Sequence, residues 1–238
     1  MIPIFCESTR NASVLAWMKS STASPQTYDA WVAGTLPFDS PEIQRAFTMT
    51  ADIWFDDAYV YGGRKKIMTE PFYVSPSHLF DQPPGCYMHK QSSFVLQFFP
   101  EDAVFGEDYD FFYLPPVDPQ FGKPVLGAGD MLAMINDRPE VRQVMRYLAT
   151  AESVRYFVEE GGIIAPHKDT PFEWYASPAQ LELAQIFLEA DTYRFDASDA
   201  MPAEVGTGAF WQGIIDWVNG EDLDVVLPAI DAAWPVRD

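Results

Sequence analysis

The sequence predicts an α/β fold, in which short strands alternate with longer helices. Candidate strands are few, short and far apart along the chain. Between them, apolar residues recur at helical spacing behind Ser-Pro and Asp positions that are typical helix starts. Strands separated by long helical stretches favour a layered α/β structure over a sandwich of sheets.

The helices are predicted from their caps. Ser40 precedes Pro41, which pairs an N-cap with a first-turn proline, and Asp137 with Glu140 resembles a capping box. Gly161 and Gly220 each follow a predicted helix and are typical of the glycine that caps a helix C-terminus. The helices expected in this way cover residues 40–54, 137–148, 150–160, 177–188, 208–219 and 222–234.

Strands are expected at 85–88, 109–114 and 124–126, with a weaker candidate at 2–5. The second of these runs directly into the proline-rich stretch 115–119, and the third ends at Gly127-Ala128-Gly129-Asp130. A chain that leaves one strand through a run of prolines and then enters an unrelated strand is typical of a hinge between two lobes.

Composition restricts the partners. The 238 residues are 48% hydrophobic, which is enough for a packed core, and their formal net charge is −20. This charge excludes nucleic acid and an anionic membrane surface as expected partners, because both repel an acidic chain. No stretch of residues is apolar enough over a sufficient length to cross a membrane, and the N-terminus shows no secretory signal pattern.

Few residues suggest catalysis or a cofactor. The three histidines are far apart without metal-ligand spacing, so neither a metal nor a cofactor is expected. Gly127-x-Gly129 lacks the third glycine of a dinucleotide site, and Ser92 lacks the glycine-flanked turn of a nucleophile. The sequence therefore does not predict an enzyme.

Aromatic residues make up 15% of the chain and suit a sugar site, in which rings cover sugar faces and carboxylates bind hydroxyls. Most aromatic residues at helical spacing belong to a core, and we expect this of Phe47, Phe157 and Trp217. Tyr87 and Trp211 are better ligand candidates, because each lies beside a glycine-containing turn at the start of an element. The two cysteines, Cys6 and Cys86, are either buried thiols or one disulfide bond.

Four motifs in a shared order carry a resemblance to a known family. The chain resembles extracytoplasmic solute-binding proteins of ABC importers, of the carbohydrate-binding type related to maltose-binding protein and most closely the alpha-glucoside-binding group. The motifs are IWFDDAYVYGG at 53–63, DQPPGCYMHKQSS at 81–93, FYLPP at 112–116 and GAGDMLAMINDRPEVRQVMRYL at 127–148. The start of a late helix at 209–211 adds to them.

The resemblance implies a periplasmic-binding-protein type II fold, mostly its C-terminal lobe with a partial N-terminal-lobe segment. Residues 1–120 and 171–238 would form the second lobe, and 121–170 the hinge crossover and the partial first-lobe segment. A signal peptide and a first lobe of roughly 150 residues would be missing before residue 2. We therefore expect an exposed apolar face on 125–148 and the following helix, which a sheet that this chain does not encode would cover.

The resemblance also implies function and site residues. The protein would bind an oligosaccharide or alpha-glucoside between two lobes, as a monomer in the periplasm or outside the cell, and deliver it to the permease subunits. Tyr87 and Trp211 would stack on the sugar, Gly127 and Gly129 would allow close backbone approach, and Asp130 would accept hydroxyl hydrogen bonds. Glu7, with Ser8, would lie at an earlier crossover.

Because the family works outside the cytoplasm, the resemblance makes a Cys6–Cys86 bond more plausible, provided that their Cα atoms lie within about 7 Å. Two alternatives to a binding protein stay open. One is a glycoside hydrolase, which needs two carboxylates facing each other at roughly 5–5.5 or 6.5–9.5 Å. The other is a non-functional remnant, or a domain that pairs with a separately encoded first lobe.

Overall fold

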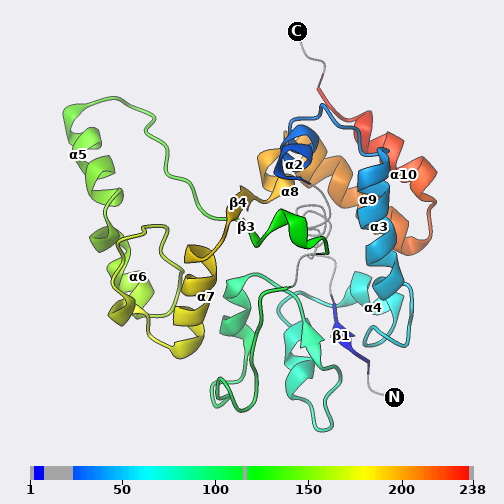
Figure 1. The fold of residues 1–238 in the computed structure, drawn as a ribbon, viewed down its shortest axis with the longest axis horizontal. Coiled ribbons are helices and arrows are strands. Elements are labelled where there is room, and N and C mark those ends of the chain that lie inside the picture. Colours follow the sequence, from blue (N-terminus) through cyan, green and yellow to red (C-terminus); the bar gives the residue numbers. More distant parts are fainter. Residues whose placement is uncertain (1–2, 8–23, 115–116, 236–238) are drawn as a thin grey trace. The chain divides into compact units, whose positions relative to one another are not determined.

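The computed structural model describes residues 3–7, 24–114 and 117–235. It contains two compact units along the chain (Figure 1). Unit 1 combines Met1–Glu101, Leu114–Ala128 and Asp191–Asp238, and unit 2 combines Asp102–Tyr113 and Gly129–Ala190. The predicted division at residues 120 and 170 concerns lobes of a larger protein and stays a prediction.

Unit 1 is a helix-rich α/β structure with two small parallel sheets. Its strands are β1 (Phe5–Cys6), β2 (Met88–His89), β3 (Pro124–Gly127) and β4 (Thr192–Phe195). Its α-helices are α2 (Pro25–Val32), α3 (Pro41–Trp54), α4 (Arg64–Thr69), α8 (Ala197–Ala200), α9 (Trp211–Asn219) and α10 (Leu223–Asp231). Short 3-10 turns cover Ser75–Phe80, Ser93–Phe98 and Pro119–Phe121, and a π-helical segment covers Glu204–Phe210. The predicted α/β class is thus confirmed, whereas the finer fold type stays a prediction.

The strands pair in parallel, which requires long connections between them. In the first sheet Phe5 lies opposite Met88 and Cys6 opposite His89. In the second sheet β3 pairs with β4 in the register Pro124 to Thr192 through Gly127 to Phe195. In each sheet, the carboxyl ends of the two strands therefore lie at the same edge.

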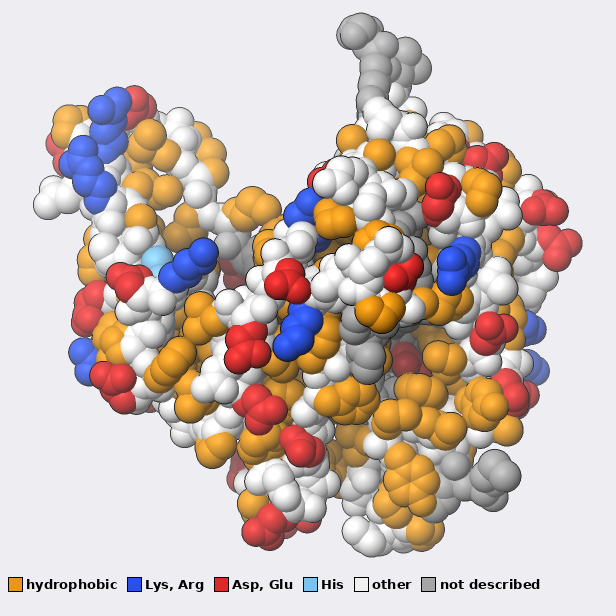
Figure 2. All heavy atoms as spheres, viewed as in Figure 1, with side chains coloured by type: hydrophobic (Ala, Val, Ile, Leu, Met, Phe, Trp, Pro, Cys, Tyr) orange, Lys and Arg blue, Asp and Glu red, His pale blue; other side chains and the backbone are white. Residues whose placement is uncertain are grey.

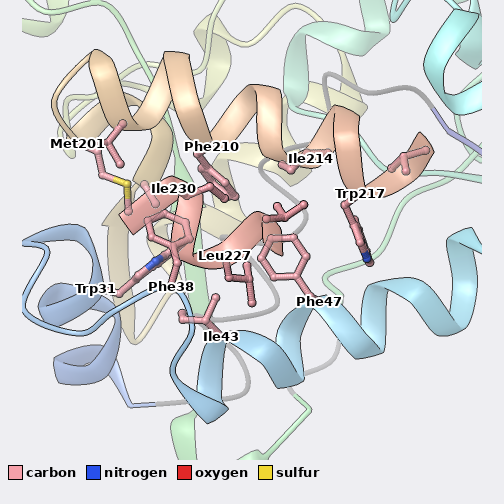
Figure 3. Packing of buried hydrophobic residues seen from close by; sticks show 14 of the residues in the cluster. Trp31, Phe38, Ile43, Phe47, Met201, Phe210, Ile214, Trp217, Leu227 and Ile230 are labelled. Carbon is pink, nitrogen blue, oxygen red and sulfur yellow. The ribbon is translucent and has the colours of Figure 1, made fainter. Parts of the chain in front are cut away.

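The core of unit 1 lies between α3, α9, α10 and the π-helical segment. Phe47 is fully buried, and its ring centroid lies 5.0 Å from that of Trp217 on α9. A second aromatic group joins Trp31, Phe38 and Phe210, with Phe38 and Phe210 centroids 5.1 Å apart (Figure 3). The expected packing roles of Phe47 and Trp217 are confirmed.

Unit 2 holds α5 (Pro139–Leu148), α6 (Arg155–Glu159) and α7 (Pro178–Leu188), with 3-10 turns at Ala151–Val154 and Phe172–Trp174. None of the residues of α5 is buried. Exposure reaches 94% at Ile135 and 55% at Val144, so an exposed apolar surface is present on this part of the predicted range, whereas Val125 on β3 and Val158 on α6 are buried. The expected packing role of Phe157 is wrong, because its side chain on α6 is 55% exposed.

Two local predictions are corrected. No strand forms at 109–114, where the Phe111 amide donates a hydrogen bond to the Asp110 carboxylate at 2.8 Å. Such local side-chain bonds occupy backbone donors that a strand ladder would use. Asp137 does not cap α5 either; the N-cap position is Arg138, and Asp137 instead pairs with the Arg142 guanidinium.

We predict that Phe47→Ala lowers the free energy of unfolding of unit 1 by about 3–5 kcal/mol, because it removes a ring packed in a filled core. The matched control is Val225→Ala, which truncates an exposed side chain on α10 and is expected to change stability by no more than about 0.5 kcal/mol. Urea unfolding followed by tryptophan fluorescence measures both. Equal effects of the two substitutions would contradict this placement of the core.

Candidate functional site

The candidate site lies at the carboxyl ends of the four strands of unit 1. Glu7 directly follows β1, Lys90 follows β2, and Asp196 follows β4, while Gly127 is the last residue of β3. In parallel α/β sheets, ligands bind outside this edge. We call Glu7, Lys90, Gly127 and Asp196 the strand-end group.

β1 and β2 are joined by a disulfide bond and a side-chain hydrogen bond in addition to their backbone pairing. Cys6 and Cys86 form a disulfide bond with a Cα–Cα distance of 5.6 Å, across 80 residues of sequence. His89 donates its Nδ1 proton to the Cys6 carbonyl oxygen at 2.6 Å, and burial lowers the pKa of its imidazole. The Cα distance meets the condition derived from the sequence, and these links fix Glu7 beside the end of β2.

Charge couples the two sheets. Glu7 and Asp196 are buried, and Lys90 is partly buried. Burial lowers the pKa of the Lys90 ammonium to about 8, while the negative charges of Glu7 and Asp196 oppose that shift. The Lys90 ammonium is therefore under the influence of one carboxylate that follows β1 and of another that follows β4.

The end of β4 is fixed by hydrogen bonds. The Asp196 amide donates to the Gly127 carbonyl at 2.9 Å, and the Tyr28 hydroxyl donates to the Phe195 carbonyl at 2.6 Å. Oδ1 of Asp196 accepts from the Ser198 amide at 2.9 Å and from its hydroxyl at 2.6 Å. The Asp196 carboxylate is therefore held in one orientation.

Gly127 has a packing reason to be glycine. A Cβ at this position would lie 2.6 Å from the ring of Tyr193 on the neighbouring strand, which is closer than real contacts allow. The group that approaches the Gly127 backbone closely in this structure is therefore the ring of Tyr193. A contact of Gly127 with ligand stays a prediction.

The two aromatic candidates lie in different parts of unit 1. Tyr87 directly precedes β2; its amide donates to the Ile4 carbonyl at 3.1 Å, and its side chain is 61% exposed. Trp211 begins α9 after the π-helical segment and packs partly against the core. An exposed ring such as that of Tyr87 is available for stacking on a ligand, whereas Trp211 offers only the part of its indole that the core leaves open.

Gly129 and Asp130 belong to unit 2. Both are exposed, and the space around the Cα of Gly129 is open. Ser8 lies outside the described residues. Of the predicted ligand residues, Glu7 and Gly127 each lie at the carboxyl end of a strand of unit 1.

Sequence reasoning missed Lys90 and Asp196. Lys90 lies inside the predicted motif at 81–93, and its position one residue after a strand was the available signal. Asp196 was missed because β4, with the sequence TYRF, was not predicted as a strand.

Other surface features offer less chemistry. An open hollow of about 550 Å³ is lined by Phe55, Arg64 and Trp217 with acidic residues around Asp222, and it includes none of the predicted ligand residues. Among residues 3–7, 24–114 and 117–235, no group of three or more His, Cys, Asp or Glu is arranged to hold a metal ion. Within the same ranges, no helix combines the length and apolarity needed to cross a membrane.

The chain is similar to two curated binding proteins over nearly its whole length. It is 41% identical over 214 residues to the osmoprotective compounds-binding protein GgtB of Synechocystis sp. (strain ATCC 27184 / PCC 6803 / Kazusa), an alignment that covers 90% of this chain and 51% of that protein. It is 38% identical over 217 residues to the alpha-glucosides-binding periplasmic protein AglE of Rhizobium meliloti (strain 1021), covering 90% of this chain and 47% of that protein. The chain thus spans about half the length of these relatives.

No family model matches the chain. No solved structure matches it either. The relationship therefore rests on the two sequence alignments, and at this identity over 90% of the chain it is one of homology.

We predict that replacing both Cys6 and Cys86 by alanine lowers the free energy of unfolding of unit 1 by about 2–5 kcal/mol, because the bond closes a long loop. Denaturant unfolding of the oxidised chain and the double variant measures this. Adding a reductant is the control: it destabilises the parent chain and leaves the variant unchanged. A reductant without effect on the parent chain would contradict the bond.

A second prediction follows from the lowered pKa of Lys90. From about pH 8 upward, the folded chain has released this proton while the unfolded chain keeps it up to the ordinary pKa of 10.5, so folding stability rises with pH. Lys90→Met lacks this contribution. We therefore expect the free energy of unfolding of the parent, minus that of the variant, to increase between about pH 8 and 9.5. This pH range lies below the one in which tyrosine ionises.

Urea unfolding of both proteins at closely spaced pH values measures the shift, since every other titrating group is common to the two. Parallel curves for parent and variant over this range would show that the Lys90 ammonium has an ordinary pKa.

Proposed function

Because this chain is homologous to solute-binding proteins over nine-tenths of its length, we propose that it forms part of the substrate-binding component of an ABC importer. The similarity to GgtB and AglE is the observation that carries the proposal. Its work would be capture and release of a solute, without bond chemistry. Its site of action would be the periplasm or the outer face of the cell envelope, where a permease receives the solute.

The ligand we propose is an alpha-glucoside or a similarly hydroxylated small solute. The strand-end group supplies what sugar hydroxyls require: buried carboxylates as acceptors on Glu7 and Asp196, and an ammonium donor on Lys90. Tyr87 supplies an exposed ring for the apolar face of a sugar. Trp211, also in unit 1, would add the part of its indole that the core leaves open. Gly129 and Asp130 of unit 2 stay predicted ligand residues.

The folded arrangement also supports binding over hydrolysis. A glycoside hydrolase uses one carboxylate as a nucleophile or base and one as an acid. Here the two buried carboxylates of the strand-end group share the positive charge of Lys90. Both relatives, moreover, are binding proteins by name.

Titration calorimetry of the 238-residue chain with maltose, trehalose and sucrose tests the proposal. We expect saturable heat with at least one of these sugars, and no release of glucose. Heat that continues after saturation, together with released glucose, would show an enzyme. A folded chain that gives no heat with any of the three would contradict the proposed ligand class.

We predict that Tyr87→Ala weakens binding of that sugar about 10-fold or more, which corresponds to about 1.4 kcal/mol, because it removes the stacking ring. Tyr73→Ala is the matched control, since Tyr73 is an exposed tyrosine of unit 1 that, unlike Tyr87, does not adjoin a strand. Equal affinities of the two variants would remove Tyr87 from the site.

A further inference from the structure

The segment 81–87 of unit 1 carries Tyr87, the exposed ring proposed to stack on the ligand, and leads into β2. Of residues 81–87, all of which lie in the described part of the chain, only Cys86 is buried. Its bond to Cys6 fixes one point of the segment. The direction of the Tyr87 side chain also depends on the backbone before that point, which burial of apolar side chains does not fix.

The chain on either side of this segment is packed or paired. The 3-10 turn Ser75–Phe80 comes before it, and the ring centroids of Phe80 and Phe99 lie 5.0 Å apart. β2 comes after it and pairs with β1. Figure 2 shows hydrophobic side chains gathered over the part of unit 1 in which the turns Ser75–Phe80 and Ser93–Phe98 lie. The segment 81–87 therefore runs between two well-supported parts of unit 1.

His78 joins this segment to the end of α4 through both nitrogens of its ring. Nδ1 lies 2.9 Å from Oδ2 of Asp81, and Nε2 lies 3.0 Å from Oε1 of Glu70. A carboxylate is an acceptor only, and a protonated imidazole donates from both nitrogens. The backbone adds a further contact, because the Gly85 amide donates to the His78 carbonyl oxygen at 2.8 Å. His78 thus contacts the segment at two places.

The His78 ring is itself held in place. The Tyr61 ring lies against it with centroids 4.3 Å apart, and Nζ of Lys66 lies 2.6 Å from Oε2 of Glu70. Burial raises the pKa of the Glu70 carboxyl, but the hydrogen bonds from Lys66 and His78 lower it by more, so this pKa lies below its ordinary value. Glu70 is therefore a carboxylate at neutral pH and can accept from His78.

Gly85 shows how closely the segment packs on this group. A Cβ at position 85 would lie 3.0 Å from the Tyr61 ring and 3.1 Å from the Cβ of His78, which is tighter than ordinary van der Waals contact. The backbone of the segment therefore lies directly against His78 at a position shortly before Tyr87.

We propose that His78 is a positioning residue for the ligand: through Glu70 and Asp81, it holds the segment 81–87 in the conformation that presents Tyr87. The proposal rests on the proposed function, in which Tyr87 contacts the sugar. Hydrogen bonds that fix the support of a binding side chain keep its geometry without touching the ligand. An acid or base role for His78 is not supported, because both ring nitrogens already face carboxylate oxygens of the folded chain.

Hydrogen exchange of the 238-residue chain tests the positioning role without any sugar. His78→Ala and Asp81→Ala are each expected to speed exchange at the amides of Gly85 and Tyr87 at least about 10-fold, because the segment then opens locally. Amides of α9 should keep the rates of the parent chain. Asp52→Ala, which removes an exposed carboxylate from α3, is the matched control and should leave all these rates unchanged.

The Asp81 side chain is 48% exposed, so Asp81→Ala is expected to fold even if His78→Ala does not. Equal acceleration in α9 and in the segment would show that the variants only destabilise the fold. Unchanged rates at Gly85 and Tyr87 would show that the segment is held without His78. Either result would overturn the proposal.

A double-mutant cycle tests whether His78 acts through Tyr87. Binding is measured by calorimetry with whichever of maltose, trehalose and sucrose gives saturable heat. His78→Ala is expected to weaken binding at least about 5-fold in the parent chain, but less than about 2-fold when Tyr87 is already alanine. Asp52→Ala should bind as the parent does. The same loss in both backgrounds would show that His78 does not position the ring, and this too would overturn the proposal.

The two measurements separate this proposal from the proposed function. A chain that binds none of the three sugars would contradict the proposed ligand class. The exchange rates at Gly85 and Tyr87 would still decide whether His78 holds the segment.

Discussion

The parallel pairing of β1 with β2, closed by the Cys6–Cys86 bond, is the constraint on which the candidate site depends. It sets Glu7 and Lys90 at one edge of the sheet. Lys90 in turn feels the carboxylate of Asp196, which is held by the pairing of β4 with β3. The arrangement thus sets which buried carboxylates act on the charge of Lys90.

The two units differ in how completely they bury their large apolar side chains. Unit 1 buries an aromatic core between α3, α9 and α10 and can hold its strand ends rigidly. Unit 2 leaves large apolar side chains such as Ile135 and Tyr156 in water. Unit 1 therefore offers the rigid support that a binding site needs.

Features determined by local sequence were predicted well. The helices around Phe47, Val144 and Trp217 follow from apolar periodicity, although Asp137 does not cap the second of them. The exposed side chains of α5 were implied by the family resemblance. Features that depend on distant segments were not predictable from any single segment. β4 is four residues long and contains an arginine, and its partner β3 lies more than 60 residues away in the sequence. The position of Lys90 directly after β2 was a local signal, but the effect of the Asp196 charge on it was not visible in any single segment.

The central claim is that the strand ends of unit 1 bind a sugar. Hydrogen exchange of the chain, with and without maltose, trehalose or sucrose, tests it most directly. The account predicts that one of these sugars slows exchange at the amides of Glu7, Tyr87, Lys90 and Asp196, while those of α5 are unchanged. Unchanged exchange at all four amides in the presence of each sugar would contradict it.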